Sequence, residues 1–243
     1  MSSKNKYVDF VSDEDFLEVV TPIVEAYSFE EKTIDEDIIL NLLKYGKNTN
    51  DEIKTIFDIV IKDSSLKDWA DAEIKRQEDK SVSTALGTFH QNLLGKVDGW
   101  INLHKGDTTK VDLKNEDNTI FIELKNKYNT LNAGGKSDVR INLEKLTKDY
   151  PNAMTYWAYI VSRNYKTGEE VWHMKDTPNN ERIHKIYGKK VYELITGDPD
   201  ALEKLYKAIP IAIVDILGED YRITDEKTLN IINEYRNFVF HEH

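Results

Sequence analysis

The change in hydrophobic period after residue 95 is the feature that most constrains the fold. Before it, apolar residues recur at helical spacing, whereas three later segments alternate with a period of two: residues 99–104 (GWINLH), 110–115 (KVDLKN) and 119–127 (TIFIELKNK). Alternating segments joined by short turn-like pieces are typical of neighbouring strands. The sequence therefore predicts a three-strand meander that follows a run of helices.

Helical patterns occupy the chain on the N-terminal side of the meander. Acidic residues gather at the start of several of them, and Ser12 stands where an N-cap would open the first. The expected helices are residues 12–27, 34–46, 49–61, 64–80 and 81–95.

A loop rich in Asn and Gly, residues 129–137, follows the meander and leads into an expected helix at 138–150. Three further strands are then predicted, at residues 153–162, 169–175 and 189–197. The tail is expected to be helical over residues 198–218 and 224–240, with Asp198 as N-cap, Gly218 as the stop and Pro210 bending or breaking the first of these helices.

The order of these elements indicates the fold class. A helix, three strands, a helix and two strands in succession make an α/β arrangement with a mixed sheet. We expect one domain over residues 1–243, with a helical N-terminal region (1–80), a central core (82–175) and a C-terminal strand with helices (176–243).

The hairpin between the second and third strands brings like charges together. If Asp117 and Asn118 form a two-residue turn, Leu113 faces Ile122 and Val111 faces Leu124 on an apolar side. The other side then sets Asp112 against Glu123, Lys110 against Lys125 and Lys114 against Phe121.

Opposed like charges destabilise a hairpin, so this pattern needs another reason. Two converging carboxylates supply the oxygen ligands that Mg²⁺ prefers, with water and a phosphate completing its shell. Lys125 lies one pleat from Glu123, where an ammonium can orient the attacking water or balance charge on a phosphate. A solvated charged face remains the alternative interpretation.

The composition limits which cellular compartment and which binding partners are expected. The net charge is −11, yet residues 96–148 hold ten Lys and Arg against eight Asp and Glu, so the segment with the carboxylate pair is the one that is not acidic. The chain has no cysteine, which excludes disulfides and thiolate metal sites and fits a reducing cytoplasm. The first residues lack an apolar signal core and no apolar run is long enough to span a bilayer, so we expect no membrane association.

At these residues the chain resembles a known superfamily. Asp on the second strand and Glu-x-Lys on the third resemble the PD-(D/E)XK nucleases, although Val111 stands at the position of the proline. The longer wording, FHQ at residues 89–91 and ELKNKYNT at 123–130, is similar to the type II restriction endonucleases that cut GGNCC-type sites. The resemblance implies a restriction-endonuclease-like mixed sheet flanked by helices, with residues 82–175 as the nuclease core.

The resemblance also implies roles for individual residues. Asp112 and Glu123 would be ligands of Mg²⁺, and Lys125 would be the catalytic lysine. Gln91 lies where members place a helical Glu or Gln that reaches the metal through water. His90 is the alternative, because a helix turns by about 100° per residue and both side chains cannot face the site equally.

The loop after the third strand offers candidates for DNA contact. Its glycines would let backbone amides approach phosphates, and its basic and amide side chains could contact phosphates or base edges: Lys127, Asn129, Asn132, Lys136 and Arg140. A flexible surface loop is the alternative. Asp98 could compete with Asp112 for a metal, but a turn residue before Gly99 is the simpler interpretation.

Three functions remain open at the level of sequence. The first is an Mg²⁺-dependent type II restriction endonuclease that acts on double-stranded DNA as a homodimer, since one chain supplies one site. A cognate DNA methyltransferase is implied by the resemblance. The second is a less specific repair or recombination nuclease of the same fold, and the third is a DNA-binding module without catalysis.

Overall fold

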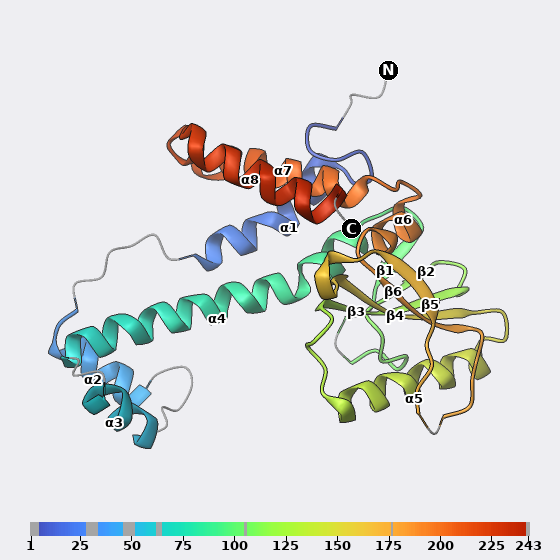
Figure 1. Cartoon of the computed structure of the whole chain (residues 1–243), viewed down its shortest axis with the longest axis horizontal. Helices are drawn as coiled ribbons and strands as arrows, with labels where there is room; N and C mark the ends of the chain where they lie inside the picture. The colour runs from blue at the N-terminus through green and yellow to red at the C-terminus, as the bar shows by residue number, and fades with distance from the viewer. Residues whose placement is uncertain are drawn as a thin grey trace. The chain divides into compact units, whose positions relative to one another are not determined.

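The computed structural model describes residues 5–27, 34–45, 52–61, 65–104, 106–175 and 177–241 (Figure 1). These residues form two compact units. One comprises residues 1–22 and 86–243 and contains the sheet; we call it the sheet unit. The other, residues 23–85, is the helical unit. The N-terminal helical region expected over residues 1–80 is thus divided between the two units.

Four helices precede the sheet. The first, α1, begins after Ser12, whose hydroxyl accepts the backbone N–H of Asp15 at 3.1 Å, as predicted for an N-cap. The bounds of the four helices are α1 Asp13–Ala26, α2 Glu36–Tyr45, α3 Glu52–Ile61 and α4 Leu66–Leu94.

The prediction of two helices over residues 64–80 and 81–95 was wrong, because α4 is continuous over 29 residues. No Gly or Pro interrupts it before Gly87. The hydroxyls of Ser81 and Thr84, polar groups that compete with helices when they turn toward other partners, instead donate to carbonyls four residues back, those of Gln77 and Lys80.

A six-stranded mixed sheet forms the centre of the sheet unit, which confirms the predicted α/β class. Its strands lie in the order β1-β2-β3-β4-β6-β5. β3 is parallel to β4 and β4 to β6, whereas the other neighbouring pairs are antiparallel. The bounds are β1 Trp100–Asn102, β2 Leu113–Asn115, β3 Ile120–Lys127, β4 Met154–Val161, β5 Gly168–Val171 and β6 Ile183–Tyr187.

Helices cover both faces of this sheet (Figure 1). α5 (Ala133–Asp149) packs on the face of Phe121 and Trp157, where buried Leu143 and Ile183 complete an apolar cluster. α6 (Lys189–Thr196) covers the opposite face and places Tyr192 in the core. β3 is consequently buried on both sides at its start, as expected of a central strand.

The C-terminal third corrects two predictions. Residues 189–197 form α6 and not a strand, because Gly188 at φ +65° ends β6 and the next residues bury one helical face. α7 (Ala201–Leu217) begins after Asp200, while Asp198 lies outside and accepts the backbone N–H of Asp200 at 2.9 Å. α7 also continues through Pro210 and ends at Gly218 as expected, and α8 (Glu226–His241) follows.

Candidate active site

The β2–β3 hairpin has the predicted register, but its ladder is shorter than expected. Leu113 pairs with Ile122 and Lys114 with Phe121. The ladder stops at Leu113, so the further pairs predicted for Asp112, Val111 and Lys110 do not form. Lys110 has φ +56°, which turns the chain away, and Val111 packs in the cluster of Phe121 rather than beside Leu124.

At the end of this ladder, the side chain of Asp112 bonds to β3 instead. Its Oδ2 accepts the backbone N–H of Leu124 at 2.7 Å, and its own backbone N–H donates to the carbonyl of Ile122 at 3.0 Å. A carboxylate therefore takes the place that a backbone carbonyl would hold in a longer ladder. This bond fixes the carboxylate beside β3.

The structure brings Asp112, Glu123 and Lys125 together. Lys125 Nζ lies 2.6 Å from Glu123 Oε1 and 3.5 Å from Asp112 Oδ2. All three side chains are largely buried, with exposed fractions of 13% for Glu123, 21% for Asp112 and 26% for Lys125. Two carboxylates thus converge on one cationic group, here an ammonium.

The charges of this cluster are interdependent. Burial raises the pKa of Glu123, and the nearby charge of Asp112 raises it further, while Lys125 opposes both. Trp157 stands beside Glu123 on β4 and is 5% exposed, so its ring helps to exclude water. Burial alone would lower the pKa of Lys125, but its attraction to Asp112 and Glu123 outweighs burial and raises that pKa.

These three residues line one cavity of about 970 Å³ in the sheet unit. Its walls come from the C-terminal turns of α4, the segment between β1 and β2, and the middle of β3. The polar residues that line it besides the charged cluster include Thr88, Gln91, Asn92, His104, Asp107, Thr108 and Lys110. A concave site with converging charged groups is the arrangement expected of an active site.

Gln91, and not His90, faces this cavity. Gln91 Nε2 donates to Asn102 Oδ1 at 2.7 Å and lies 3.5 Å from the carbonyl of Leu103. His90 turns to α6, where its Nδ1 lies 2.7 Å from the hydroxyl of Tyr192. Burial lowers the pKa of His90 to about 4, so the ring is neutral at pH 7.

The residues predicted to contact DNA are spread along the end of β3 and α5. Lys127 and Asn129 are exposed. Asn132 is the N-cap of α5, because its side chain accepts the backbone N–H of Gly135 at 2.8 Å. Lys136 Nζ lies 5.4 Å from the ring centre of Trp157. None of them lines the active-site cavity.

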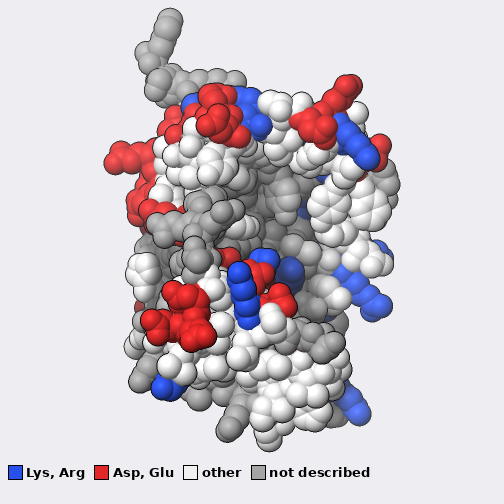
Figure 2. All heavy atoms as spheres, turned by 90° about the vertical axis from the view of Figure 1, so that its left-hand side faces the viewer, with Lys and Arg blue, Asp and Glu red and all other residues white. Residues whose placement is uncertain are grey.

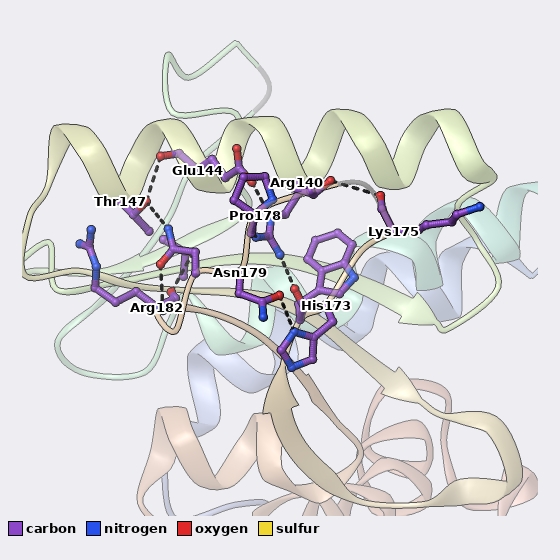
Figure 3. Close-up of polar contacts among 12 residues, drawn as sticks. Arg140, Glu144, Thr147, His173, Lys175, Pro178, Asn179 and Arg182 are labelled. Atoms are coloured by element: carbon purple, nitrogen blue, oxygen red, sulfur yellow. Dashed lines mark hydrogen bonds and ion pairs between the residues drawn. The ribbon is translucent and has the colours of Figure 1, made fainter.

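Arg140 occupies a different environment from the one predicted (Figure 3). It is 2% exposed and donates to the carbonyl of Trp172, to the carbonyl of Pro178 at 3.0 Å and to Glu144 at 2.8 Å. These bonds hold the connection between β5 and β6 against α5. A guanidinium committed in this way is not presented to a ligand, so its predicted DNA contact is not supported by its placement.

Sequence reasoning did not identify the amide group next to Gln91. Asn102 accepts from Gln91 and donates to Asn92 Oδ1 at 2.9 Å, which joins α4 to β1 beside the cavity. The group depends on the close approach of Gly95, where a Cβ would lie 2.5 Å from that of Asn102, and such a tertiary contact is not visible in the sequence. Asp98 is an exposed turn residue outside the cavity, as the simpler interpretation held.

Charge is mixed on the surface that Figure 2 shows. Among the described residues drawn there, Lys and Arg lie in small groups beside Asp and Glu and do not merge into one basic face. Attraction of a polyanion would therefore depend on particular basic side chains rather than on overall charge.

Comparisons with known proteins agree with this geometry. The model of the Eco47II restriction endonuclease family matches residues 8–218. The chain is 33% identical over 220 residues to the type II restriction enzyme Sau96I of Staphylococcus aureus, a match that covers 87% of this chain and 81% of that enzyme. It is 34% identical over 229 residues to the type II restriction enzyme Eco47II of Escherichia coli, covering 87% of this chain and 89% of that one. The chain thus belongs to the Eco47II restriction endonuclease family.

Proposed function

We propose that this protein is a type II restriction endonuclease that uses Mg²⁺ to hydrolyse both strands of DNA at a short palindromic site containing GG and CC. The observation that carries the proposal is the convergence of Asp112, Glu123 and Lys125 in one cavity. Membership of a family of site-specific endonucleases supports the reaction. The resemblance to enzymes that cut GGNCC-type sites supports the class of sequence.

The donor set at this cavity fits a hard divalent cation. Asp112 and Glu123 supply only oxygen ligands, and they already direct carboxylates at one cationic position. Within the described residues no third His, Cys, Asp or Glu joins them, so water and a DNA phosphate would fill the remaining positions. Bound Mg²⁺ would polarise the phosphate and favour ionisation of the attacking water.

The pKa of Lys125 depends on the charges of Asp112 and Glu123. Its ammonium is held by the two carboxylates, and burial is the strongest influence on its pKa in the opposite direction. Neutralising the carboxylates would weaken that hold and lower the pKa of Lys125. Lys125 would then donate a hydrogen bond to a phosphate oxygen or to the attacking water. As the water oxygen bonds to phosphorus, the P–O bond to the leaving strand would break; the water's proton would pass to solvent, and the leaving oxygen would take a proton from solvent.

Gln91 and the exposed side chains near β3 complete the proposed assignments. Gln91 would position water in the cavity, because its amide is held by Asn102 and Leu103. Lys127, Asn129, Asn132 and Lys136 would contact DNA from the end of β3 and the start of α5. Asn132 also caps α5 and Lys136 also lies over the ring of Trp157, whereas Lys127 and Asn129 are exposed side chains.

The biological setting follows from the reaction. The described residues of one chain form one such site, so a twofold homodimer would cut both strands of a palindrome. A cognate DNA methyltransferase would protect host DNA, and the cytoplasm is the expected compartment for a chain without cysteine. None of the described helices combines the length and apolar content needed to cross a membrane.

Digestion of a fully sequenced plasmid, followed by mapping of the ends, tests the proposal. Wild type in Mg²⁺ is expected to give a fixed set of fragments, and Asp112→Asn and Glu123→Gln to give none. Glu116→Gln is the matched control, because this substitution also replaces a carboxylate by an amide but lies in the exposed turn of the same hairpin. A smear or simple nicking would indicate a less specific nuclease, and binding without cleavage would indicate a non-catalytic module.

A further inference from the structure

A second cavity, of about 320 Å³, lies beside the active-site cavity. The segment that precedes β2 separates the two, and Thr108 and Lys110 line both. The opposite wall of the second cavity belongs to α5, which contributes Asn142, Lys145, Leu146 and Asp149, and to its C-cap residue Tyr150. None of these residues takes part in the proposed chemistry.

Two lysines in this cavity have no acidic partner. Among the described residues, neither Lys110 nor Lys145 lies within ion-pair distance of a carboxylate, and Asp149 lines the cavity without reaching either. Some lysines of this acidic chain are paired, for example Lys96 with Glu18 at 2.7 Å, whereas these two face one cavity without a described carboxylate in reach. Two ammonium groups on opposite walls of one cavity favour an anion between them.

The backbone conformation of Lys110 also supports a role for its side chain. Its φ of +56° lies in the left-handed region, which a residue with a long side chain adopts uncommonly. Asp107 holds the turn, because its Oδ1 accepts both the backbone N–H and the hydroxyl of Thr109, at 2.8 and 2.5 Å. Glycine would suit this conformation better, so the presence of lysine indicates a use for the side chain.

We propose that Lys110 and Lys145, with the hydroxyl of Thr108, bind a backbone phosphate of DNA next to the phosphodiester that is cut. This inference rests on the proposed function. Phosphates of one strand recur every ~3.4 Å along the helix axis, so a strand with one phosphate at Asp112 and Glu123 carries its neighbours past the shared wall. Such a contact fixes the register of the strand and reads no base.

The salt dependence of binding tests this subsite. Affinity is measured in Ca²⁺, which can neutralise the carboxylates, for a duplex with the cleavage site and for one without it, over a series of salt concentrations. Lys110→Gly and Lys145→Met are each expected to weaken both complexes by a similar factor and to lower the salt slope by about one. Lys227→Met, which changes an exposed lysine on α8 outside both cavities, is expected to leave the slope unchanged.

Folding is checked with the same proteins. Lys110→Gly is expected to keep the wild-type melting temperature, because glycine accepts the left-handed conformation; Lys110→Asn, which also tolerates it, serves as a second neutral variant. Unchanged slopes in folded variants would overturn the subsite while wild type still cuts at fixed positions, so the proposed function would stand. A loss confined to the duplex with the site would instead indicate base reading and also overturn it. A wild type that neither binds nor cuts DNA would contradict the proposed function itself.

Discussion

Lys125 Nζ lies 2.6 Å from Glu123 Oε1, two residues away on the same face of β3. The ammonium is thus the counter-ion of a carboxylate whose pKa is raised by burial, and its removal is expected to affect both the chemistry and the stability.

Lys125→Met is expected to lower the cleavage rate by about 10²- to 10⁴-fold, the range typical of a positioned proton donor or acceptor. It should also lower the free energy of unfolding at pH 7, because Asp112 and Glu123 would face each other without a cation. Single-turnover cleavage and urea unfolding measure the two effects. Lys114→Met is the matched control, since that lysine bonds to Asn118 in the same hairpin, at 2.7 Å.

The stability loss of Lys125→Met should shrink on acidification. In the folded state the pKa of Glu123 is raised, so this group favours folding increasingly as the pH falls through its folded pKa. Without the ammonium that opposes the shift, the pKa of Glu123 rises further. Glu123 then becomes neutral at a higher pH than in wild type, which removes its repulsion with Asp112. An equal loss at pH 7 and pH 5 would contradict the electrostatic origin.

His90 should make the protein sensitive to acid. The pKa of His90 falls from 6.5 to about 4 on folding. The neutral ring therefore makes its full contribution to the free energy of unfolding above pH 6.5, and this contribution is lost as the pH falls toward 4. The loss amounts to at most roughly 3 kcal/mol, from the energy of one pKa unit. Urea unfolding at several pH values should show a shallower acid slope for His90→Asn than for wild type, and parallel slopes would exclude His90 as the cause.

Gly87 within α4 and Gly95 directly after it should respond oppositely to the same substitution. Gly95→Ala would place a Cβ 2.5 Å from Asn102 Cβ and 3.0 Å from its backbone nitrogen, so β1 must shift, at a cost of about 1–3 kcal/mol. Gly87→Ala meets no atom within 4 Å and should stabilise the helix by about 0.5–1 kcal/mol. Thermal unfolding of the pair tests the packing of α4 on β1, and a neutral Gly95→Ala would contradict it.

Arg140→Gln should destabilise the fold by roughly 2–4 kcal/mol, because the carbonyls of Trp172 and Pro178 lose their donor. The salt slope of DNA binding should not change, since the guanidinium is buried (Figure 3). Arg163→Gln, at an exposed position, is the control for stability. A lower salt slope in a folded Arg140→Gln protein would restore the DNA contact predicted from sequence.

The hairpin could be predicted from sequence because both of its determinants are local. The period-two pattern sets the faces, and the pair Leu113–Ile122 confirms the predicted register. The turn is longer than the two residues predicted: residues 116–119 lie between the strands, and the backbone N–H of Asn118 donates to the carbonyl of Asn115 at 3.1 Å. The shorter ladder could not be predicted, because it depends on a bond between Asp112 and an amide 12 residues away and on the left-handed backbone of Lys110.

Tertiary packing explains the other differences. Residues 189–197 contain β-branched and aromatic residues that favour a strand, yet Val191, Tyr192 and Ile195 bury one helical face against the sheet. The choice between His90 and Gln91 likewise needed the position of Tyr192, which is 102 residues from His90. The burial of Arg140 depends on carbonyls from the connection between β5 and β6, whose path the sequence did not specify.

The bond from Leu124 to Asp112 has a final consequence for how the enzyme meets its substrate. One oxygen of that carboxylate is tied to the backbone, so the side chain has already given up its rotational freedom when the chain folds. In the proposed mechanism its second oxygen would keep a set direction before DNA arrives, so this acid would need no reorientation during turnover. The bond that completes the sheet would then also set the starting geometry of the proposed reaction.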